Sequence, residues 1–233
     1  TMKETLKNSG IDSIMPSGGG IETAAAVAWA VGKGYKPFLF TEVVDRDNPA
    51  VKGMKRATQD IAEYFNVPFK VVYNDIPMDN LNVPITDFAF TNVIKLVLGN
   101  PSLRFKYLIN GGNAEDSMQQ RVQIRYLQRI IASRWSYQHD MHGVKWDAFI
   151  NMPISLFPLE YLTKSEIIGI VMQEHPELVK KIWTCVSPIK QENNYKQCKK
   201  CSKCTEWSSA LRVAKQARLK IQEGLNYEHN LRK

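Results

Sequence analysis

The sequence predicts an α/β protein with a doubly wound, parallel, five-stranded sheet, followed by a helical C-terminal segment that carries a cysteine cluster. Short apolar segments alternate with helical patterns in the order β-α-β-α-β between residues 11 and 73, which is typical of a parallel sheet. Two apolar segments end directly in glycines and polar side chains, as strands do at the ligand-binding edge of such a sheet. All four cysteines lie in the last quarter of the chain.

The composition limits the class of protein. The chain has 233 residues, of which 44% are hydrophobic and 23% charged, and this suffices for one α/β domain with a small appendage. It contains no apolar run of membrane-spanning length and begins without the apolar core of a signal peptide. We therefore expect a cytoplasmic protein with no membrane partner. The formal net charge of +8 favours polyanions, and ATP or nucleic acid would both satisfy it.

The individual elements follow from apolar periodicity and from turn residues. Strands are predicted over residues 11–15, 36–44, 69–73, 107–110 and 146–153, and helices over 24–31, 49–65, 91–98, 117–137 and 164–173. Asn48 is expected to cap the second helix, with Pro49 at its first position. Thr163 and Glu166 fit a capping box, and capping is their expected role. A closing helix follows the cysteines, and residues 226–233 are expected to fray.

A glycine run lies where the first strand becomes the first helix. Glycines let backbone N–H groups face a ligand without side chains in the way, and a helix N-terminus adds partial positive charge, so this turn suits a phosphate. Glu22 could hold Mg²⁺ there, and Thr23 offers a hydroxyl. We expect a side chain at Gly19 to fill the phosphate space and leave the fold intact. The alternative is a glycine-rich turn that binds no ligand.

The run is neither a P-loop, which needs Lys-Ser/Thr after its last glycine, nor a Rossmann fingerprint, whose glycines are spaced. It resembles the PP-loop of the ATP-pyrophosphatase superfamily, Ser-Gly-Gly-x-Asp-Ser. The serine of that pattern is either Ser17 or replaced by Gly18, and we prefer the second register because it keeps Glu22 and Thr23 as the carboxylate and hydroxyl. The ATP-binding residues expected from this resemblance are Ser17, Gly18, Gly19, Gly20, Glu22 and Thr23.

The cysteines have the spacing C-x12-C-x2-C-x2-C, formed by Cys185, Cys198, Cys201 and Cys204. In a cytosolic chain a disulfide framework is not expected. Four thiolates with two tight spacings favour a closed, structural Zn²⁺ site. An iron–sulfur cluster is the alternative, as in some tRNA-thiolating PP-loop enzymes.

Four motifs, in order between about residues 11 and 212, resemble the 7-cyano-7-deazaguanine synthase family. They are Asn-Ala-Glu-Asp at 113–116, Pro-Leu-x-x-Leu-Thr-Lys-x-Glu-Ile over 158–167, Trp-Thr-Cys at 183–185, and the segment with Cys198, Cys201 and Cys204. The family also carries Tyr-Gly-Gln-Arg/Lys-His after the second strand, of which this chain keeps only Arg46.

The resemblance implies an adenine nucleotide α-hydrolase-like fold, with a PP-loop domain over 1–160 and a helical, zinc-binding segment over 161–233. It also implies an ATP-dependent ligase that adenylates 7-carboxy-7-deazaguanine and converts it with ammonia to the nitrile. ATP, Mg²⁺ and Zn²⁺ would be bound. Nucleic acid is not required, and a homodimer is common in this family.

Catalytic roles are expected for Glu22, Arg46 and Lys164, and substrate contacts for Arg46, Asn113, Glu115 and Asp116. Arg46 is the nearest cation by sequence to meet the substrate carboxylate, and Lys164 the second. Its alternative is a surface pairing with Asp45 or Asp47. Two other functions stay open: another PP-loop adenylating enzyme with a related substrate, and a non-catalytic homologue that binds nucleotide or nucleic acid.

Overall fold

The computed structural model describes residues 10–43, 48–73, 105–116, 154–192 and 194–231, with side chains as far as Leu219. Its centre is a five-stranded sheet in which all neighbouring strands are parallel, in the order β3-β2-β1-β4-β5. The strands are β1 (Ser13–Pro16), β2 (Pro37–Val43), β3 (Phe69–Tyr73), β4 (Tyr107–Ile109) and β5 (Ile154–Leu156). The predicted α/β class with a parallel five-stranded sheet is therefore confirmed.

The strand order creates a switch point beside β1. The chain moves from β1 to β2 and β3 on one side, and returns to place β4 and β5 on the other side. In parallel sheets, ligands bind at the carboxyl ends of the strands where the order reverses. Here that place lies between the ends of β1 and β4.

The middle strands are apolar because both of their faces are covered. Ile14 and Met15 of β1 are fully buried, and Ile14 pairs with Phe38 of β2 and with Leu108 of β4. The edge strand β3 is only half-buried. Burial therefore falls from the switch point toward this edge.

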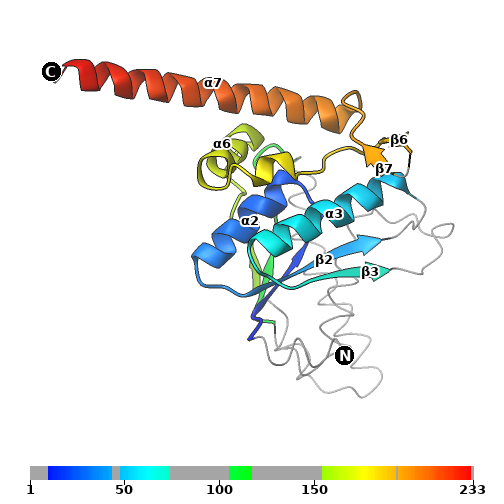
Figure 1. Cartoon of the computed structure of the whole chain (residues 1–233). Coiled ribbons are helices and arrows are strands. Elements are labelled where there is room, and N and C mark those ends of the chain that lie inside the picture. The colour runs from blue at the N-terminus through cyan, green and yellow to red at the C-terminus, as the bar shows by residue number, and fades with distance from the viewer. Residues whose placement is uncertain (1–9, 44–47, 74–104, 117–153, 193, 232–233) are drawn as a thin grey trace.

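The described helices are α2 (Ile21–Gly32), α3 (Pro49–Tyr64), α6 (Lys164–Glu174), the short 3₁₀ helix η3 (Leu178–Lys180) and α7 (Ser202–Leu231). Figure 1 shows α2 and α3 covering one face of the sheet, α6 lying on α2, and α7 crossing above α6. Ile21 and Val27 of α2 belong to the same buried cluster as Ile167 and Val171 of α6. None of the helices in the described residues is long and apolar enough to cross a membrane.

The predicted helix starts are confirmed at two places. Asn48 accepts a hydrogen bond from the backbone N–H of Ala50, with Pro49 in the first turn. Thr163 and Glu166 form the predicted capping box, in which each side chain accepts from the other residue's backbone N–H.

Other predictions fall outside the description or need correction. The helices expected over 91–98 and 117–137 and the strand expected over 146–153 lie outside the described residues, and β5 begins directly afterwards at Ile154. The fraying expected from residue 226 is wrong, because α7 continues to Leu231. The hairpin of β6 (Ile189–Gln191) and β7 (Asn194–Lys196) was not predicted, because its mostly exposed residues lack apolar alternation.

The C-terminal segment packs on the same core as the sheet. Leu178, Ile182 and Ala214 share a buried cluster with Met15 and Ile109 of the two strands at the switch point. The division at residue 160 stays a prediction.

Candidate nucleotide site and metal centre

The two glycine-bearing turns meet at the switch point. Ser17–Gly20 follows β1, and Gly111 and Gly112 follow β4, its neighbour in the sheet. A Cβ atom at Gly111 would lie 3.3 Å from Cβ of Glu22 and 3.5 Å from its backbone. The second turn therefore approaches the first turn of α2 closely, and glycine provides the room for this.

Gly19 faces α3 and not the open side of the loop. It has φ of +70°, and a Cβ atom there would lie 2.7 Å from Cβ of Ala57 and 2.8 Å from the carbonyl oxygen of Met54. Any side chain at Gly19 would disturb α3 and strain the backbone. The expectation that Gly19→Val would leave the fold intact is therefore wrong.

Buried hydroxyl groups support the loop from below. Oγ of Ser17 lies 2.8 Å from Oγ1 of Thr58 and 3.4 Å from Oγ1 of Thr23, and it accepts from the N–H of Gly19 at 3.2 Å. Thr41 of β2 donates to the backbone carbonyl of Ser17 and to Thr58. All four hydroxyl-bearing residues are buried. This network fixes the shape of the turn before any ligand arrives.

A buried lysine joins the loop to the C-terminal helices. Nζ of Lys164 lies 3.1 Å from Oε1 of Glu22 and pairs on its other side with Oε1 of Glu206 on α7. The Lys164 side chain is 8% exposed. Burial alone would lower the pKa of Lys164, but attraction to Glu22 and hydrogen bonds to both carboxylates raise the pKa above its usual value. Lys164 is therefore charged at neutral pH.

The Asn-Ala-Glu-Asp turn is held by its own side chains. The N–H of Asn113 donates to Oδ2 of Asp116, and the N–H of Glu115 donates to Oδ1 of Asn113, both at 2.8 Å. Nδ2 of Asn113 reaches Oε1 of Glu22 at 3.4 Å. The N–H of Ala114 bonds to the carbonyl of Leu162, which links the turn to the start of α6.

The structure thus brings together Glu22, Asn113 and Lys164, which lie far apart in the sequence. Glu115, exposed, and Asp116, half-buried, lie in the adjoining turn. Arg46 lies outside the described residues, so its two roles stay predictions.

Sequence reasoning missed Glu206, Thr41 and Thr58. Glu206 carries one weak signal, its place two residues after Cys204. The two threonines carry none, because only the fold brings them under the loop.

The four cysteines form a compact cluster. Their sulfur atoms all lie within 4.8 Å of one another, and Sγ of Cys201 is 3.9 Å from Sγ of Cys185. Tetrahedral zinc with bonds of about 2.3 Å requires sulfur atoms about 3.8 Å apart. The geometry therefore fits a bound metal such as zinc, as the spacing predicts.

The thiols differ in acidity. Backbone N–H groups, chiefly of Cys204 and Val186, lower the pKa of Cys201 to about 6, and those of Lys200 and Cys201 lower the pKa of Cys198. Burial raises the pKa of Cys185, and burial with neighbouring thiols raises that of Cys204 to about 12. The turn that carries two stabilised thiolates also holds Lys199 at φ of +60°, a conformation that favours glycine.

Trp183 connects the cysteine cluster to the glycine loop. Its backbone N–H donates to the carbonyl of Gly19 at 3.0 Å, and its Nε1 donates to the carbonyl of Cys185 at 2.8 Å. Its ring packs on Gly53 of α3, where a Cβ atom would overlap the indole. The segment that carries the cysteines therefore contacts the glycine loop directly through Trp183.

Comparison with known proteins adds little. No family model and no curated protein matches the chain. Among solved structures, a chain described as a predicted subunit of tRNA methyltransferase from Methanocaldococcus jannaschii is 14% identical, with a TM-score of 0.37. The alignment covers 81% of this chain and 96% of that one. A likeness of this strength supports no argument about activity.

Proposed function

We propose that this chain is a PP-loop enzyme that uses ATP to activate a carboxylate. The observation that carries the proposal is the buried Lys164, held by Glu22 where the glycine-rich loop meets the turn after β4. It places a cation, a carboxylate and an N-terminal helix turn at the switch point of a parallel sheet. The sequence resemblance to the PP-loop supports the same reading.

The loop suits the phosphates of ATP. Gly20 is the N-cap of α2 and has no side chain with which to occupy the first N–H groups of the helix. Such groups, together with the helix dipole, attract anions. Ser17 and Thr23 would contribute indirectly, because their buried hydroxyls hold the loop in the shape that binds the phosphates.

Glu22 would hold Mg²⁺ against the phosphate oxygens. Its side chain is 22% exposed, and among the described residues its contacts to Lys164 and Asn113 both use Oε1. Oε2 is thereby left for a metal ion, and Mg²⁺ commonly takes one or two carboxylates together with phosphate oxygens. The ion would supply screening of the phosphate charge.

Lys164 would stabilise the charge that develops during adenylation. In this step a carboxylate oxygen of the substrate attacks the α-phosphorus of ATP, and pyrophosphate leaves. A cation fixed in a buried site lowers the energy of that charge without reorganising at the moment of reaction. Glu22 and Glu206 keep Lys164 charged and hold it in place.

For the substrate we propose 7-carboxy-7-deazaguanine, following the family resemblance. Ammonia would displace AMP from the acyl-adenylate to give an amide, and a second activation by ATP would remove the amide oxygen and leave the nitrile. The exocyclic amine and ring N–H of the base would donate to Glu115 or Asp116. Asn113 would orient these residues through the hydrogen bonds within the turn.

The cysteine cluster would hold Zn²⁺ as a closed structural site. All four ligands come from the protein, so no position is open for an activated water. The metal would instead fix the segment that presents Trp183 to the loop and Glu206 to Lys164.

Release of AMP and pyrophosphate from ATP tests the proposal. The reaction contains 7-carboxy-7-deazaguanine and ammonium, and mass spectrometry identifies the product. We expect Glu22→Gln to lower kcat by about 10²–10³-fold, as loss of an electrostatic catalytic group does. Glu174→Gln removes an equivalent charge at the exposed end of α6 and should leave kcat unchanged.

Two outcomes would contradict parts of the proposal. AMP release at the wild-type rate by Glu22→Gln would remove Glu22 from the site. Binding of Mg-ATP without AMP release, with this and related carboxylated deazapurines, would overturn the ligase and leave a nucleotide-binding homologue.

A further inference from the structure

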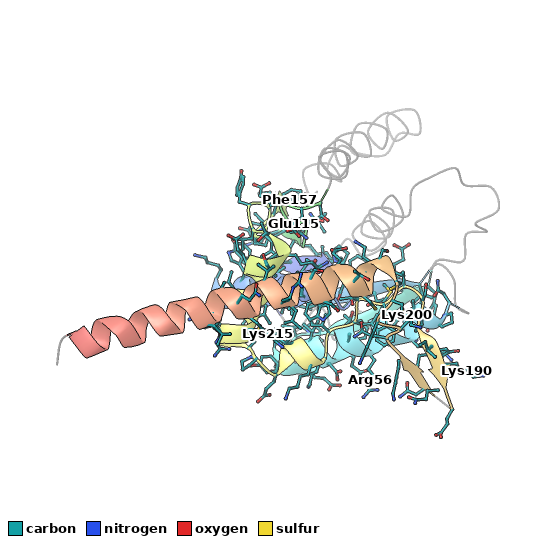
Figure 2. The ribbon with its side chains drawn as sticks, turned by 90° about the horizontal axis from the view of Figure 1, so that it is seen from above. Arg56, Glu115, Phe157, Lys190, Lys200 and Lys215 are labelled. Atoms are coloured by element: carbon teal, nitrogen blue, oxygen red, sulfur yellow. The ribbon has the colours of Figure 1, made fainter. Side chains whose placement is uncertain are left out.

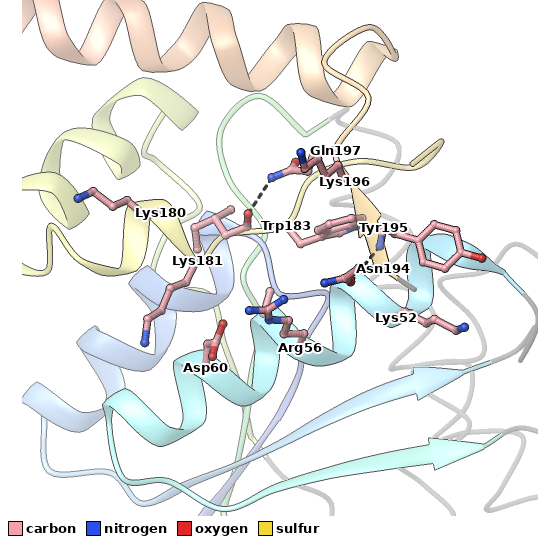
Figure 3. A pocket seen from close by; sticks show the side chains of 13 residues that line it. Lys52, Arg56, Asp60, Lys180, Lys181, Trp183, Asn194, Tyr195, Lys196 and Gln197 are labelled. Carbon is pink, nitrogen blue, oxygen red and sulfur yellow. Dashed lines mark hydrogen bonds between the residues drawn. The ribbon is translucent and has the colours of Figure 1, made fainter. Parts of the chain in front are cut away.

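A basic cleft lies between α3 and the segment that precedes the cysteine cluster. Its volume is ≈ 450 Å³, within the range of ligand pockets. Figure 3 shows its three walls: side chains from α3, from η3 and the residues after it, and from β7. Its cationic side chains are Lys52, Arg56, Lys180, Lys181 and Lys196.

The positive charge of the cleft is largely unbalanced. Among the described residues that line the cleft, Asp60 is the one carboxylate, so they carry an excess of four positive charges. All five cations are exposed, and within the described parts of the chain none of them forms an ion pair with a carboxylate. Like charges gathered without counter-charges repel one another, and an anionic ligand would remove that cost.

Aromatic and amide groups lie among the cations. Trp183 and Tyr195 line the cleft together with Asn194 and Gln197. Both rings are half-buried, and Nζ of Lys52 lies 5.3 Å from the centroid of Tyr195. Phosphates need cations, whereas bases need flat apolar surfaces and hydrogen-bonding groups. The cleft offers both sets within one volume.

We propose that this cleft binds single-stranded nucleic acid, with phosphates against the cations and a base against the aromatic residues. A small inorganic anion would use the charges but not the rings, and an acidic peptide would likewise leave the rings unused. A chain of nucleotides uses all three kinds of group. The site is independent of the proposed ATP chemistry.

The cleft is separate from the glycine loop. None of the residues Ser17–Thr23 lines it, and Trp183, whose backbone bonds to Gly19, forms part of the wall between them. Seen from above, Arg56 and Glu115 lie on opposite sides of the molecule, with α7 between them (Figure 2). Nucleic acid in the cleft would therefore leave the loop and the Asn-Ala-Glu-Asp turn accessible.

Fluorescence anisotropy with a labelled single-stranded RNA of about 12 nucleotides tests the proposal on the full chain. Each phosphate contact adds about 0.7 to the slope of log Kd against log salt. Five contacts predict a slope of about 3.5, which is about a 100-fold loss of affinity between 50 and 200 mM salt.

Two triple variants remove the same charge from different places. The cleft variant combines Lys52→Ala, Arg56→Ala and Lys181→Ala, and so removes three cations from the cleft. The control variant combines Lys33→Ala, Lys215→Ala and Arg218→Ala, which removes two lysines and one arginine from exposed positions directly after α2 and on α7. The cleft variant should weaken binding at least tenfold and lower the salt slope by about 2, whereas the control variant should change Kd less than threefold.

Tyr195→Leu keeps the charge and removes a ring, so it should weaken RNA binding about tenfold with an unchanged salt slope. Equal losses in the two triple variants would overturn the site, because they indicate diffuse attraction. Binding of poly-glutamate as tight as that of RNA, or no effect of Tyr195→Leu, would overturn the assignment to nucleic acid. Unchanged thermal unfolding of each variant excludes misfolding as the cause.

Discussion

Replacing Gly53 by alanine tests whether Trp183 joins the cysteine cluster to the glycine loop. A Cβ atom at Gly53 would lie under 3.0 Å from three carbons of the indole ring. The ring is rigid and its nearest carbon would lie 2.1 Å away, so it must retreat by about 1.5 Å to reach ordinary contact distance. The backbone N–H of Trp183 donates to the carbonyl of Gly19, and Nε1 of its ring donates to the carbonyl of Cys185. Movement of the ring therefore strains or breaks both hydrogen bonds.

The expected cost follows from three contributions. Alanine gains about 1 kcal/mol over glycine within a helix. Overpacking costs about 1–3 kcal/mol, and a weakened buried hydrogen bond about 1 kcal/mol. Gly53→Ala should therefore lower the free energy of unfolding by about 1–3 kcal/mol. Gly169→Ala in α6, where a Cβ atom meets nothing within 4 Å, should raise it by about 1 kcal/mol.

Guanidinium unfolding of the zinc-loaded protein measures both values. A second background sharpens the comparison, because Trp183→Ala removes the ring that opposes the new methyl group. In that background Gly53→Ala should be stabilising, as at Gly169, with a coupling of about 2–4 kcal/mol between the two positions. An unchanged cost of Gly53→Ala in the Trp183→Ala background would refute the role given to this contact.

Three further predictions concern the C-terminal segment. Lys199→Gly should stabilise the protein by about 1 kcal/mol in thermal unfolding because it relieves the left-handed backbone at φ +60°, whereas Lys200→Gly should not. Elemental analysis should find one zinc per chain, and Cys201→Ser should lower both zinc content and the unfolding temperature; iron with visible charge-transfer absorption would contradict zinc. The N–H and hydroxyl of Thr163 lower the pKa of Glu166, so its stabilisation of α6 should be complete above pH 4.5 and be lost as the pH falls through the folded pKa; an NMR titration of Glu166 at or above 4.5 would contradict this.

The sequence predicts those elements whose causes are local. Alternating apolar and helical periods predict the order of strands, and Asn48 and Thr163 fix two helix starts because their side chains cap their own helices. The strand β5 and the β6–β7 hairpin escape prediction because their residues are exposed or half-buried, whereas the equally short β4 is mostly buried and lies in an apolar run. The spacing of the cysteines predicts their cluster because metal ligation restricts spacing directly.

The site is predicted less completely, because its contacts join distant segments. Gly19 reads as an open glycine, yet its close neighbours are Ala57 and Met54, some 40 residues further along. Glu206 and Thr58 can be recognised as parts of the site only once α7 and α3 are placed beside the loop. Sequence patterns identify the residues that follow the strands. The residues that support them can be identified only once the helices and strands are packed together.

The position of Lys164 is the strongest sign that this edge of the sheet has a function. Lys164 is the first residue of α6, directly after its cap, where the helix dipole disfavours a cation. The residue is also buried, which costs further free energy for a charge. Two carboxylates from α2 and α7 are needed to offset these costs. An apolar side chain would serve the core better, so the presence of the lysine supports our proposal that it meets an anion beside Glu22.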